Sequence, residues 1–204
     1  MKIQVREGVV LEHDGGGNLR DILIEHDKKL LREFIAARGS DASRIDFHTE
    51  LGADTEVELM AWDDPEAAWI YRHSMSHVLA QAVRHLFPKA QLAIGPAIDG
   101  GFYYDFDVEE PFTPEDLKAI EKEMKRVVKK NHRFEREEIS RDEARSRLEG
   151  DTYKLEILDD LKEDQTLTFY TDGDFVDLCR GPHMLSTGQV KHYKLLSVAG
   201  AYWR

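Results

Sequence analysis

The spacing of hydrophobic and polar residues predicts a small structural unit at the start of the chain. Short alternating stretches over residues 3–11 predict a β-hairpin, and apolar positions over residues 22–35 predict helical packing. The glycines at 15–17 predict a flexible turn, and Asn18 after them is a candidate helix cap. An apolar stretch over residues 57–60 predicts a closing strand. The predicted order is therefore strand, strand, helix, strand.

A second pattern begins after residue 62. The tripeptide Asp64-Pro65-Glu66 combines a helix cap, a proline at the first helical position and an acid in the first turn, so it predicts a helix. This helix should run to about Phe87 and end at Pro88. The other predicted elements are two strands around a tight turn over residues 92–106, a helix over 113–130, a strand over 134–139, short helices over 140–150 and 152–161, strands over 167–170 and 175–176, and a closing strand over 192–202.

These elements predict an α+β fold with two domains. Residues 1–62 are expected to form a small ubiquitin-like β-grasp domain. Residues 63–204 are expected to form a larger α+β domain, with a long helix packed on an antiparallel sheet. The first unit has no paired acids, phosphate loop or metal-ligand spacing, so a passive or binding role is expected for it. The abrupt end at Trp203-Arg204, without a polar tail, favours a piece of a longer protein.

Composition narrows the class of protein. Hydrophobic residues make up 41% and charged residues 33% of the 204 positions, which is typical of a soluble globular chain. No apolar run reaches the length of a membrane span, and residues 1–5 are typical of a strand rather than a signal peptide. A single cysteine cannot form an internal disulfide, so we expect a cytoplasmic protein without membrane partners.

The net charge of −12 argues against a long nucleic-acid footprint, because phosphate contacts come from lysine and arginine. A basic stretch nevertheless runs from Lys118 to Arg136. Such a stretch is typical of a solvated helix face and is also compatible with a local contact to an RNA backbone.

Two short motifs carry the candidate chemistry. The first is an H-x-x-x-H pair, His73 and His77, which the predicted helix would place on one face. Small residues around it, among them Ser74, leave room for another group to approach. The second motif contains Cys179 and His183 on a turn after a predicted strand. Two histidines at this spacing are also common on exposed helices, but three imidazoles and a thiol together could hold a metal, move protons, or do both.

Three stretches resemble the editing domain of bacterial threonyl-tRNA synthetases. They are His73-Ser74-Met75-Ser76-His77-Val78-Leu79-Ala80, Gly95-Pro96 with Gly101-Phe102-Tyr103-Tyr104-Asp105, and Asp177-Leu178-Cys179-Arg180-Gly181-Pro182-His183. The end of the chain, residues 197–204, resembles the segment that leads into the aminoacylation core of that family. Residues 1–62 lie where the family carries its TGS module, a β-grasp unit.

The resemblance implies hydrolysis of seryl-tRNA(Thr), which the family forms by mistake. It implies that His73 positions or activates the attacking water, and that His77 and His183 orient water and substrate. Lys154, otherwise an ordinary helix lysine, would stabilise developing negative charge. Asp177, otherwise a turn acid, would bind the ammonium group of the substrate.

The role of Cys179 depends on whether the site binds a metal ion. A lone buried cysteine is usually a small hydrophobic residue, and we expect it to shape the pocket or position water rather than attack the ester. As a fourth ligand it would complete a zinc set with the three histidines, as in the related alanyl-type domains. The resemblance implies that the threonyl type works without requiring a metal ion there, so no cofactor is expected to be required for editing. Four protein ligands would also leave no open position for water unless one ligand is absent. ATP and a further zinc ion are expected only in the aminoacylation core, beyond Arg204.

Selectivity must distinguish serine from threonine, which carries one more methyl group. A methyl-sized difference is worth only about 1–3 kcal/mol in binding, so a second, smaller pocket is needed to reject threonine. Tyr104 and the Gly95-Pro96 segment are candidate walls of that pocket, although Tyr104 could equally be an ordinary strand aromatic. The expected partners are the acceptor end of tRNA(Thr) carrying serine and the core and anticodon-binding domains of the parent enzyme.

Two alternatives remain open at this point. The chain could be a tRNA-binding accessory fragment without activity of its own, which its acidic charge favours. It could also be a zinc-dependent hydrolase that acts on a different ester.

Overall fold

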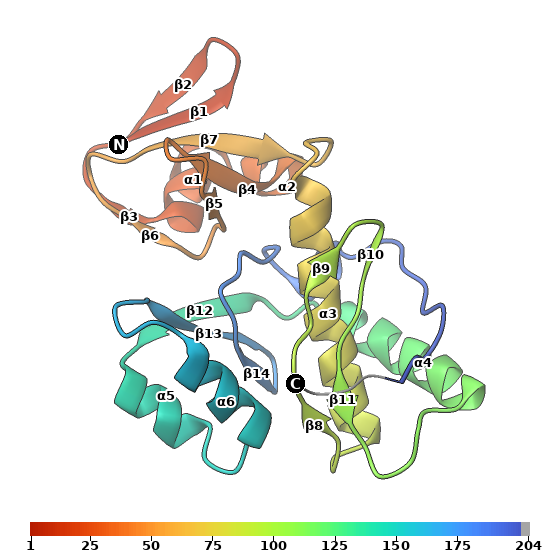
Figure 1. Cartoon of the computed structure of the whole chain (residues 1–204). Coiled ribbons are helices and arrows are strands. Elements are labelled where there is room, and N and C mark those ends of the chain that lie inside the picture. Colours follow the sequence, from red (N-terminus) through yellow and green to blue (C-terminus); the bar gives the residue numbers. More distant parts are fainter. Residues whose placement is uncertain (201–204) are drawn as a thin grey trace.

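A five-stranded mixed sheet forms the first part of the chain in the computed structural model, which describes residues 1–200 (Figure 1). Its strand order is β2-β1-β7-β4-β5, with the parallel pair β1 and β7 in the interior of the sheet. Helix α1 packs on the sheet through Leu19, Ile22 and Leu23, as a β-grasp arrangement requires. The elements of this part are β1 (Lys2–Arg6), β2 (Val9–Glu12), β3 (Gly17–Asn18), α1 (Leu19–Asp27), α2 (Leu30–Glu33), β4 (Phe34–Gly39), β5 (Arg44–Ile45), β6 (Glu50–Leu51) and β7 (Glu56–Ala61).

Strand β4 was not predicted, and assigning Phe34 and Ile35 to helical packing was wrong. Four consecutive residues, Phe34 to Ala37, are buried. Phe34 and Ala37 belong to the apolar cluster beneath α1, whereas Ile35 and Ala36 belong to a second cluster around α3. A strand that is buried on both faces does not alternate, so its pattern cannot be distinguished from that of a buried helix.

Asn18 occupies the capping position of α1, but its side chain makes no capping hydrogen bond. Its Nδ2 donates instead to the carbonyl oxygen of His48, at 3.0 Å. The position of the cap was therefore predicted, whereas its expected hydrogen bond was not found.

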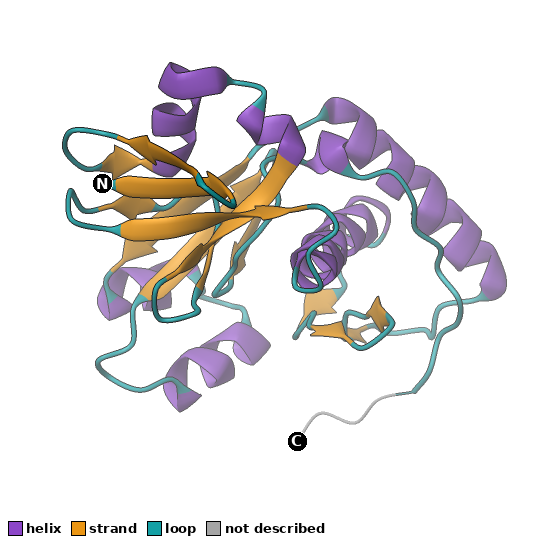
Figure 2. Ribbon diagram, turned by 90° about the horizontal axis from the view of Figure 1, so that it is seen from above, coloured by secondary structure: helices purple, strands orange, loops and turns teal. Residues whose placement is uncertain are grey.

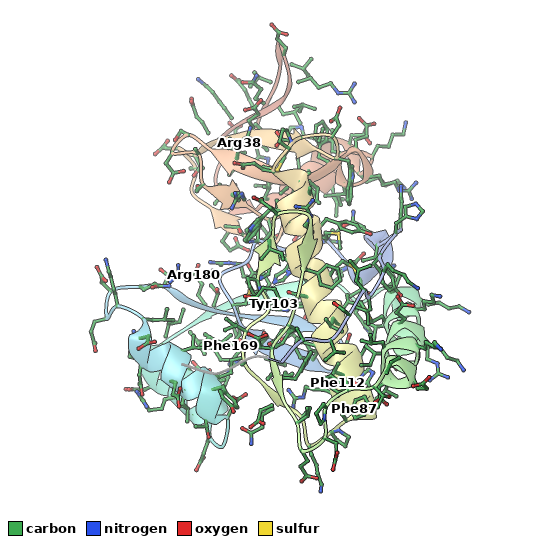
Figure 3. All side chains as sticks on the ribbon, turned by 45° about the vertical axis from the view of Figure 1, so that its right-hand side comes forward. Arg38, Phe87, Tyr103, Phe112, Phe169 and Arg180 are labelled. Atoms are coloured by element: carbon green, nitrogen blue, oxygen red, sulfur yellow. The ribbon has the colours of Figure 1, made fainter. Side chains whose placement is uncertain are left out.

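The long helix α3 (Ala67–Leu86) is the central element of the structure and is seen almost end-on in Figure 2. It begins two residues after the predicted Pro65, because the carboxylate of Asp64 caps the preceding turn by accepting from the Glu66 N–H at 2.8 Å. Helix α4 (Pro114–Lys130) lies beside α3 and starts with the capping box of Thr113 and Asp116. At the far end of α3, Phe87 packs on Phe112 with ring centroids 5.0 Å apart (Figure 3).

Four short strands lie beside α3 where two strands were predicted. They are β8 (Gln91–Leu92), β9 (Ala97–Ile98), β10 (Gly101–Phe102) and β11 (Phe106–Asp107), paired as β9 with β10 and β8 with β11. Tyr103 and Tyr104 face different surroundings, since Tyr103 is exposed and Tyr104 is buried.

A three-stranded antiparallel sheet completes the second part, in the order β12-β13-β14. Its strands are β12 (Phe134–Ile139), β13 (Leu167–Asp172) and β14 (Phe175–Leu178), all close to their predicted bounds. Helices α5 (Arg141–Arg147) and α6 (Thr152–Asp160) cover one face, where Phe169 is buried among their apolar side chains. On the other face, Phe175 joins the cluster around α3. The predicted packing of the long helix on an antiparallel sheet is therefore confirmed.

The end of the described chain differs from the prediction. A single turn of 3₁₀ helix, η1 (Thr187–Gln189), follows the sheet. Residues 192–200 form no strand, so that part of the prediction was wrong, and residues 201 and 202 lie outside the described residues. Tyr193 and Leu195 pack against the α3 cluster without strand pairing. The apolar pattern of this segment therefore reflects side-chain packing and not a strand.

The two parts share a continuous contact across the predicted boundary at residue 62. Ile35 and Met60, from strands β4 and β7, are buried in the same cluster as Ile70 and Met75 of α3. Arg38, labelled in Figure 3, forms an ion pair with Asp64 at 2.9 Å, just before α3. The division into domains 1–62 and 63–204 remains a proposal, and these contacts make relative motion of the two parts costly.

Within residues 1–200, none of the helices combines the length and the apolar character that a bilayer crossing requires.

We predict that Ile35→Ala lowers the free energy of unfolding by about 2–5 kcal/mol, because the truncation leaves a cavity in the shared core. Ile24→Ala is the matched control, since Ile24 is 38% exposed on α1 and should change stability by less than about 0.5 kcal/mol. Denaturant unfolding followed by circular dichroism measures both. Equal, small effects would contradict a shared core at Ile35.

Candidate active site

The two motifs meet in space. Helix α3 places His73 and His77 one turn apart with ring centroids 5.4 Å apart, and His183 stacks against His73 at 4.4 Å. The Sγ atom of Cys179 lies 3.2 Å from Nε2 of His73 and 3.4 Å from Nε2 of His183. One ligand atom from each of the four residues lies within 4.8 Å of the others. The segment after β14 and the middle of α3 therefore build one cluster, as the motif spacing led us to expect.

Ser74 of α3 forms hydrogen bonds with the loop that contains His183 and Met184. Its small size alone did not predict this role. Its hydroxyl donates to the Ile70 carbonyl at 2.9 Å, so its oxygen is free to accept. The Met184 N–H donates to that oxygen at 2.9 Å, and Nδ1 of His183 lies 3.2 Å from it. A serine between two histidines on a helix is a signal that sequence analysis could have weighed.

These contacts determine which imidazole nitrogens carry protons. Since the Ser74 oxygen acts as an acceptor, Nδ1 of His183 is the donor. Nδ1 of His73 likewise donates to the Pro182 carbonyl at 3.3 Å. Both Nε2 atoms therefore present lone pairs toward Cys179, and a single S–H can satisfy only one of them.

His77 is less completely bonded. Its Nε2 lies 3.7 Å from the Asp177 carboxylate, which favours a proton on that nitrogen. Its Nδ1 is buried and has no hydrogen-bond partner among the described residues. A buried lone pair without a donor is costly, so this atom calls for a water molecule, a substrate group or a metal ion.

A second cluster surrounds Lys154. Helix α6 directs this lysine inward, and its Nζ lies 2.6 Å from the Asp177 carboxylate and 3.2 Å from the Tyr104 hydroxyl. The Tyr104 hydroxyl also donates to Asp177 at 2.9 Å. Asp177 faces inward because β14 alternates, with Phe175 and Asp177 buried and Val176 exposed. The structure therefore unites the predicted Lys154, Asp177 and Tyr104 in one buried network.

Gly95 supports Tyr104 directly. A Cβ atom at this position would lie 2.1 Å from Cδ2 of the Tyr104 ring, so only glycine leaves room for the ring. The Gly95 carbonyl accepts from Ser76 of α3 at 2.6 Å, which holds the segment containing Pro96 against the helix. Gly95 therefore lies against a candidate substrate-binding tyrosine.

Burial controls the protonation of the cluster. It lowers the pKa of His73 to about 4 and that of His77 to about 3, although Asp177 opposes the shift in both. Burial also lowers the pKa of His183 and raises that of the Cys179 thiol. The three imidazoles and the thiol are therefore neutral near pH 7.

The Lys154 network is charged by contrast. Burial opposes ionisation of Asp177, but the charge of Lys154 and its hydrogen bond keep the pKa of this carboxyl below its usual value. Burial, followed by the charge of Asp177, raises the pKa of Tyr104, so its hydroxyl remains a donor. The site thus places a buried ion pair beside neutral imidazoles.

The His and Cys donors also fit a zinc ion. Imidazole nitrogen and thiolate sulfur are common zinc ligands, and Nδ1 of His77, one of the four residues, has no hydrogen-bond partner among the described residues. His73, His77, Cys179 and His183 would hold the ion, which would supply Lewis-acid chemistry only if one coordination position stayed open to water.

The chain is similar in sequence to proteins that act in aminoacyl-tRNA synthesis. Residues 167–201 match the family described as the threonyl and alanyl tRNA synthetase second additional domain. The whole chain is 46% identical over 206 residues to the threonine-tRNA ligase of Clostridium botulinum strain Hall, and 47% identical to that of Clostridium tetani strain Massachusetts. The chain spans about a third of these relatives, 32% of each. The chain is therefore related to bacterial threonine-tRNA ligases over that third, which confirms the resemblance drawn from its motifs.

We predict that the neutral histidines make the protein sensitive to acid. Below about pH 6.5 the unfolded chain binds protons that the folded imidazoles do not, so stability falls as pH drops toward 4, the pKa of His73. Each such histidine contributes a slope of at most about 1.4 kcal/mol per pH unit. Denaturant unfolding between pH 7 and pH 4.5 should therefore show a shallower loss for His73→Gln than for the wild type.

Comparing the stability-versus-pH slopes of the wild type and His73→Gln cancels the contributions of all other titrating groups. Burial raises the pKa of Asp172 to about 8, so the folded protein holds a proton that the unfolded chain has already lost. This group therefore makes the protein more stable as pH falls, which is opposite to the effect of the histidines. It is present in both proteins and cancels. Identical slopes for the two proteins would mean that His73 takes up its proton at the same pH in the folded protein as in the unfolded chain.

Proposed function

We propose that this chain is an editing fragment that hydrolyses the ester of mischarged seryl-tRNA(Thr). The observation that carries the proposal is the pairing of neutral imidazoles with the Lys154–Asp177 ion pair in one buried site. Ester hydrolysis needs an oriented water and stabilisation of negative charge, and these two groups are suited to those tasks. The relation to threonine-tRNA ligases supports the choice of ester.

Water orientation is assigned to the histidines. The Nε2 lone pair of His73 accepts a hydrogen bond from the attacking water, and His77 and His183 fix its orientation. A pKa of about 4 makes His73 a weak proton acceptor, so it holds the water rather than carrying its proton away. The water oxygen forms a bond to the ester carbon, the bond to the ribose oxygen breaks, and the proton passes to that oxygen.

Charge stabilisation is assigned to Lys154. Its ammonium group is buried, with 5% of the side chain exposed, and it stabilises the oxyanion that forms as water adds to the carbonyl. Asp177 is already bonded to Lys154 and Tyr104, so an incoming substrate ammonium would share this carboxylate with Lys154. Cys179 completes the wall as a neutral thiol that contacts two of the imidazoles.

Selectivity for serine is assigned to the walls around Tyr104. The tyrosine ring is held between Gly95 and the network of Asp177, so it has little freedom to retreat from a larger substrate. Rejection of threonine by these walls would supply the discrimination that one methyl group cannot give by attraction alone.

The wider setting follows from the relatives and is also proposed. The parent enzyme would join threonine to tRNA(Thr) in the cytoplasm with ATP, using an aminoacylation core and an anticodon-binding domain that lie outside this chain. Residues 1–62 would be its TGS module. The acceptor end of the charged tRNA would enter past His73 and Cys179, because His77 and His183 are more deeply buried.

We predict that the chain releases serine from seryl-tRNA(Thr) in single-turnover assays and leaves threonyl-tRNA(Thr) intact. Lys154→Met should slow release by about 100-fold to 1,000-fold, because a preorganised charge is lost. His73→Ala should also abolish rapid release. Lys118→Met is the matched control, since that lysine side chain is 80% exposed on α4, and it should leave the rate unchanged.

Two outcomes would overturn this assignment in different ways. Equal cleavage of both esters would remove the proposed selectivity. Binding of tRNA(Thr) without cleavage of either ester would favour the alternative of a non-catalytic accessory fragment.

A zinc-dependent hydrolase of another ester is the second candidate, and the donor set within 4.8 Å is the observation that favours it. A zinc ion held by all four side chains would have a closed coordination sphere and no site for water. For this reason the hydrolytic role is assigned to the metal-free cluster.

We predict that dialysis against 1,10-phenanthroline leaves seryl-tRNA hydrolysis within about twofold of the untreated rate, because no step uses a metal-bound water. Metal content measured by mass spectrometry on the same samples reports whether the chelator removed zinc. Loss of activity that zinc restores, and magnesium does not, would establish the alternative.

A further inference from the structure

Asp46 connects the N-terminal part of the chain to the candidate active site. It follows β5 in the first sheet, 1% exposed, and lies far in sequence from the residues it contacts. Its Oδ2 accepts from the Tyr170 hydroxyl at 2.7 Å and from the His183 backbone N–H at 3.4 Å. An acid from residues 1–62 therefore bonds to one of the clustered histidines and to the aromatic side chain beside it.

The carboxylate is held rigidly in its own loop. Its other oxygen, Oδ1, accepts from the His48 N–H and from the Thr49 hydroxyl, both at 3.0 Å. Both oxygens are thus committed as acceptors, two donors on each side. An asparagine would keep one acceptor oxygen and would turn an NH₂ group toward either the loop or the His183 N–H.

Tyr170 passes this constraint to the reactive side chains. The centroids of its ring and the His183 ring lie 4.6 Å apart. Its hydroxyl oxygen would lie 2.1 Å from a Cβ atom added at Gly181. Gly181 has φ of +63°, so this position needs glycine for its backbone as well as for space. The loop that carries Cys179 and His183 therefore fits closely around the tyrosine that Asp46 holds.

Two further contacts dock the same loop on the N-terminal part. Leu185 packs against the apolar cluster beneath α1. Nε2 of Gln189 donates to the Leu31 carbonyl at 3.3 Å, and its Oε1 accepts from the Leu185 N–H at 2.9 Å. Asp46 is the charged member of this contact, and it lies nearest to the imidazole cluster.

We propose that Asp46 is a positioning residue for hydrolysis, and that residues 1–62 thereby form part of the active-site framework rather than a separate binding module. The carboxylate fixes the backbone of His183 and the ring of Tyr170, which together set the direction of the His183 lone pair toward Cys179. This inference rests on the proposed function, because it names a residue that supports the same site.

The test compares Asp46→Asn with Asp41→Asn in the full chain. Asp41 is a matched control, since its Oδ1 also accepts from a backbone N–H two residues on, that of Ser43, and from the Ser43 hydroxyl. Asp41 is exposed, and both of these contacts stay within its own loop. Tyr170→Phe removes the hydroxyl donor alone and serves as a second variant if Asp46→Asn does not fold.

Two measurements are made on each variant. Single-turnover seryl-tRNA(Thr) hydrolysis at several enzyme concentrations separates the saturating rate constant from the half-saturating concentration. We expect Asp46→Asn to lower the rate constant about tenfold to a hundredfold and to leave half-saturation within about twofold, because misplacement affects orientation rather than binding. The double variant with Tyr170→Phe should lose no more than the worse single variant, since both act through one contact.

The second measurement is independent of activity. Nitrogen-15 NMR of the imidazoles, with His183 assigned from a His183→Gln sample, should show shifted His183 nitrogen signals in Asp46→Asn and Tyr170→Phe, and unchanged signals in Asp41→Asn. Unchanged His183 signals in both variants would overturn the proposal. A rate loss confined to half-saturation would overturn it as well, in favour of a tRNA contact. Should the wild type fail to cleave seryl-tRNA, the proposed function fails, while the NMR comparison still decides the contact of Asp46.

Discussion

The buried ion pair of Lys154 and Asp177 is the interaction on which the rest of the site depends. Removing two charges from water costs several kcal/mol for each, and the pair persists only when its geometry is good and its remaining valences are satisfied. Here the Nζ to carboxylate distance is 2.6 Å, and the Tyr104 hydroxyl bonds to both partners. Each partner comes from a different element, α6, β14 or the segment before β11. The ion pair therefore requires those elements to be fixed relative to one another.

Helix α3 satisfies that requirement because its middle, residues 73–83, is completely buried. It contacts α4 on one side, the short β9–β10 hairpin on another and the three-stranded sheet on a third (Figures 1 and 2). A helix buried on several sides cannot present a solvated polar face, so its polar residues must find partners. Ser74, Ser76 and Gln81 do so by bonding to backbone carbonyls of the helix itself or of neighbouring segments. His73 and His77 are the exception. Nε2 of His73 faces the thiol of Cys179, and Nδ1 of His77 has no partner among the described residues. Such unsatisfied groups are characteristic of functional sites.

The sequence was sufficient for most elements and for the composition of the site. Local signals such as the helix start at residue 113 and the i, i+4 spacing of His73 and His77 depend on neighbouring residues only, and these predictions agree with the structure. The missed elements depend on distant residues. Strand β4 is buried on two faces by two different clusters, and the apolar residues near Tyr193 pack without pairing. Neither Asp46 nor Tyr170 belongs to a sequence motif, and 124 positions separate them along the chain. No pattern in the sequence therefore indicates that they are in contact.

The position of Asp46 also bears on how such a chain can be divided. A β-grasp unit that carried only its own function would need a polar, solvated surface toward its neighbour. Instead, Ile35 and Met60 are buried against α3, and Leu185 is packed into the cluster of the first sheet. Removing residues 1–62 would expose apolar area and would leave the Tyr170 hydroxyl and the His183 N–H without their acceptor. Because a buried donor without a partner costs about 1–3 kcal/mol, the loop would relax toward water and carry His183 with it. The framework of the cluster thus extends across the domain boundary that the sequence suggests, and the first unit has a structural reason to remain attached.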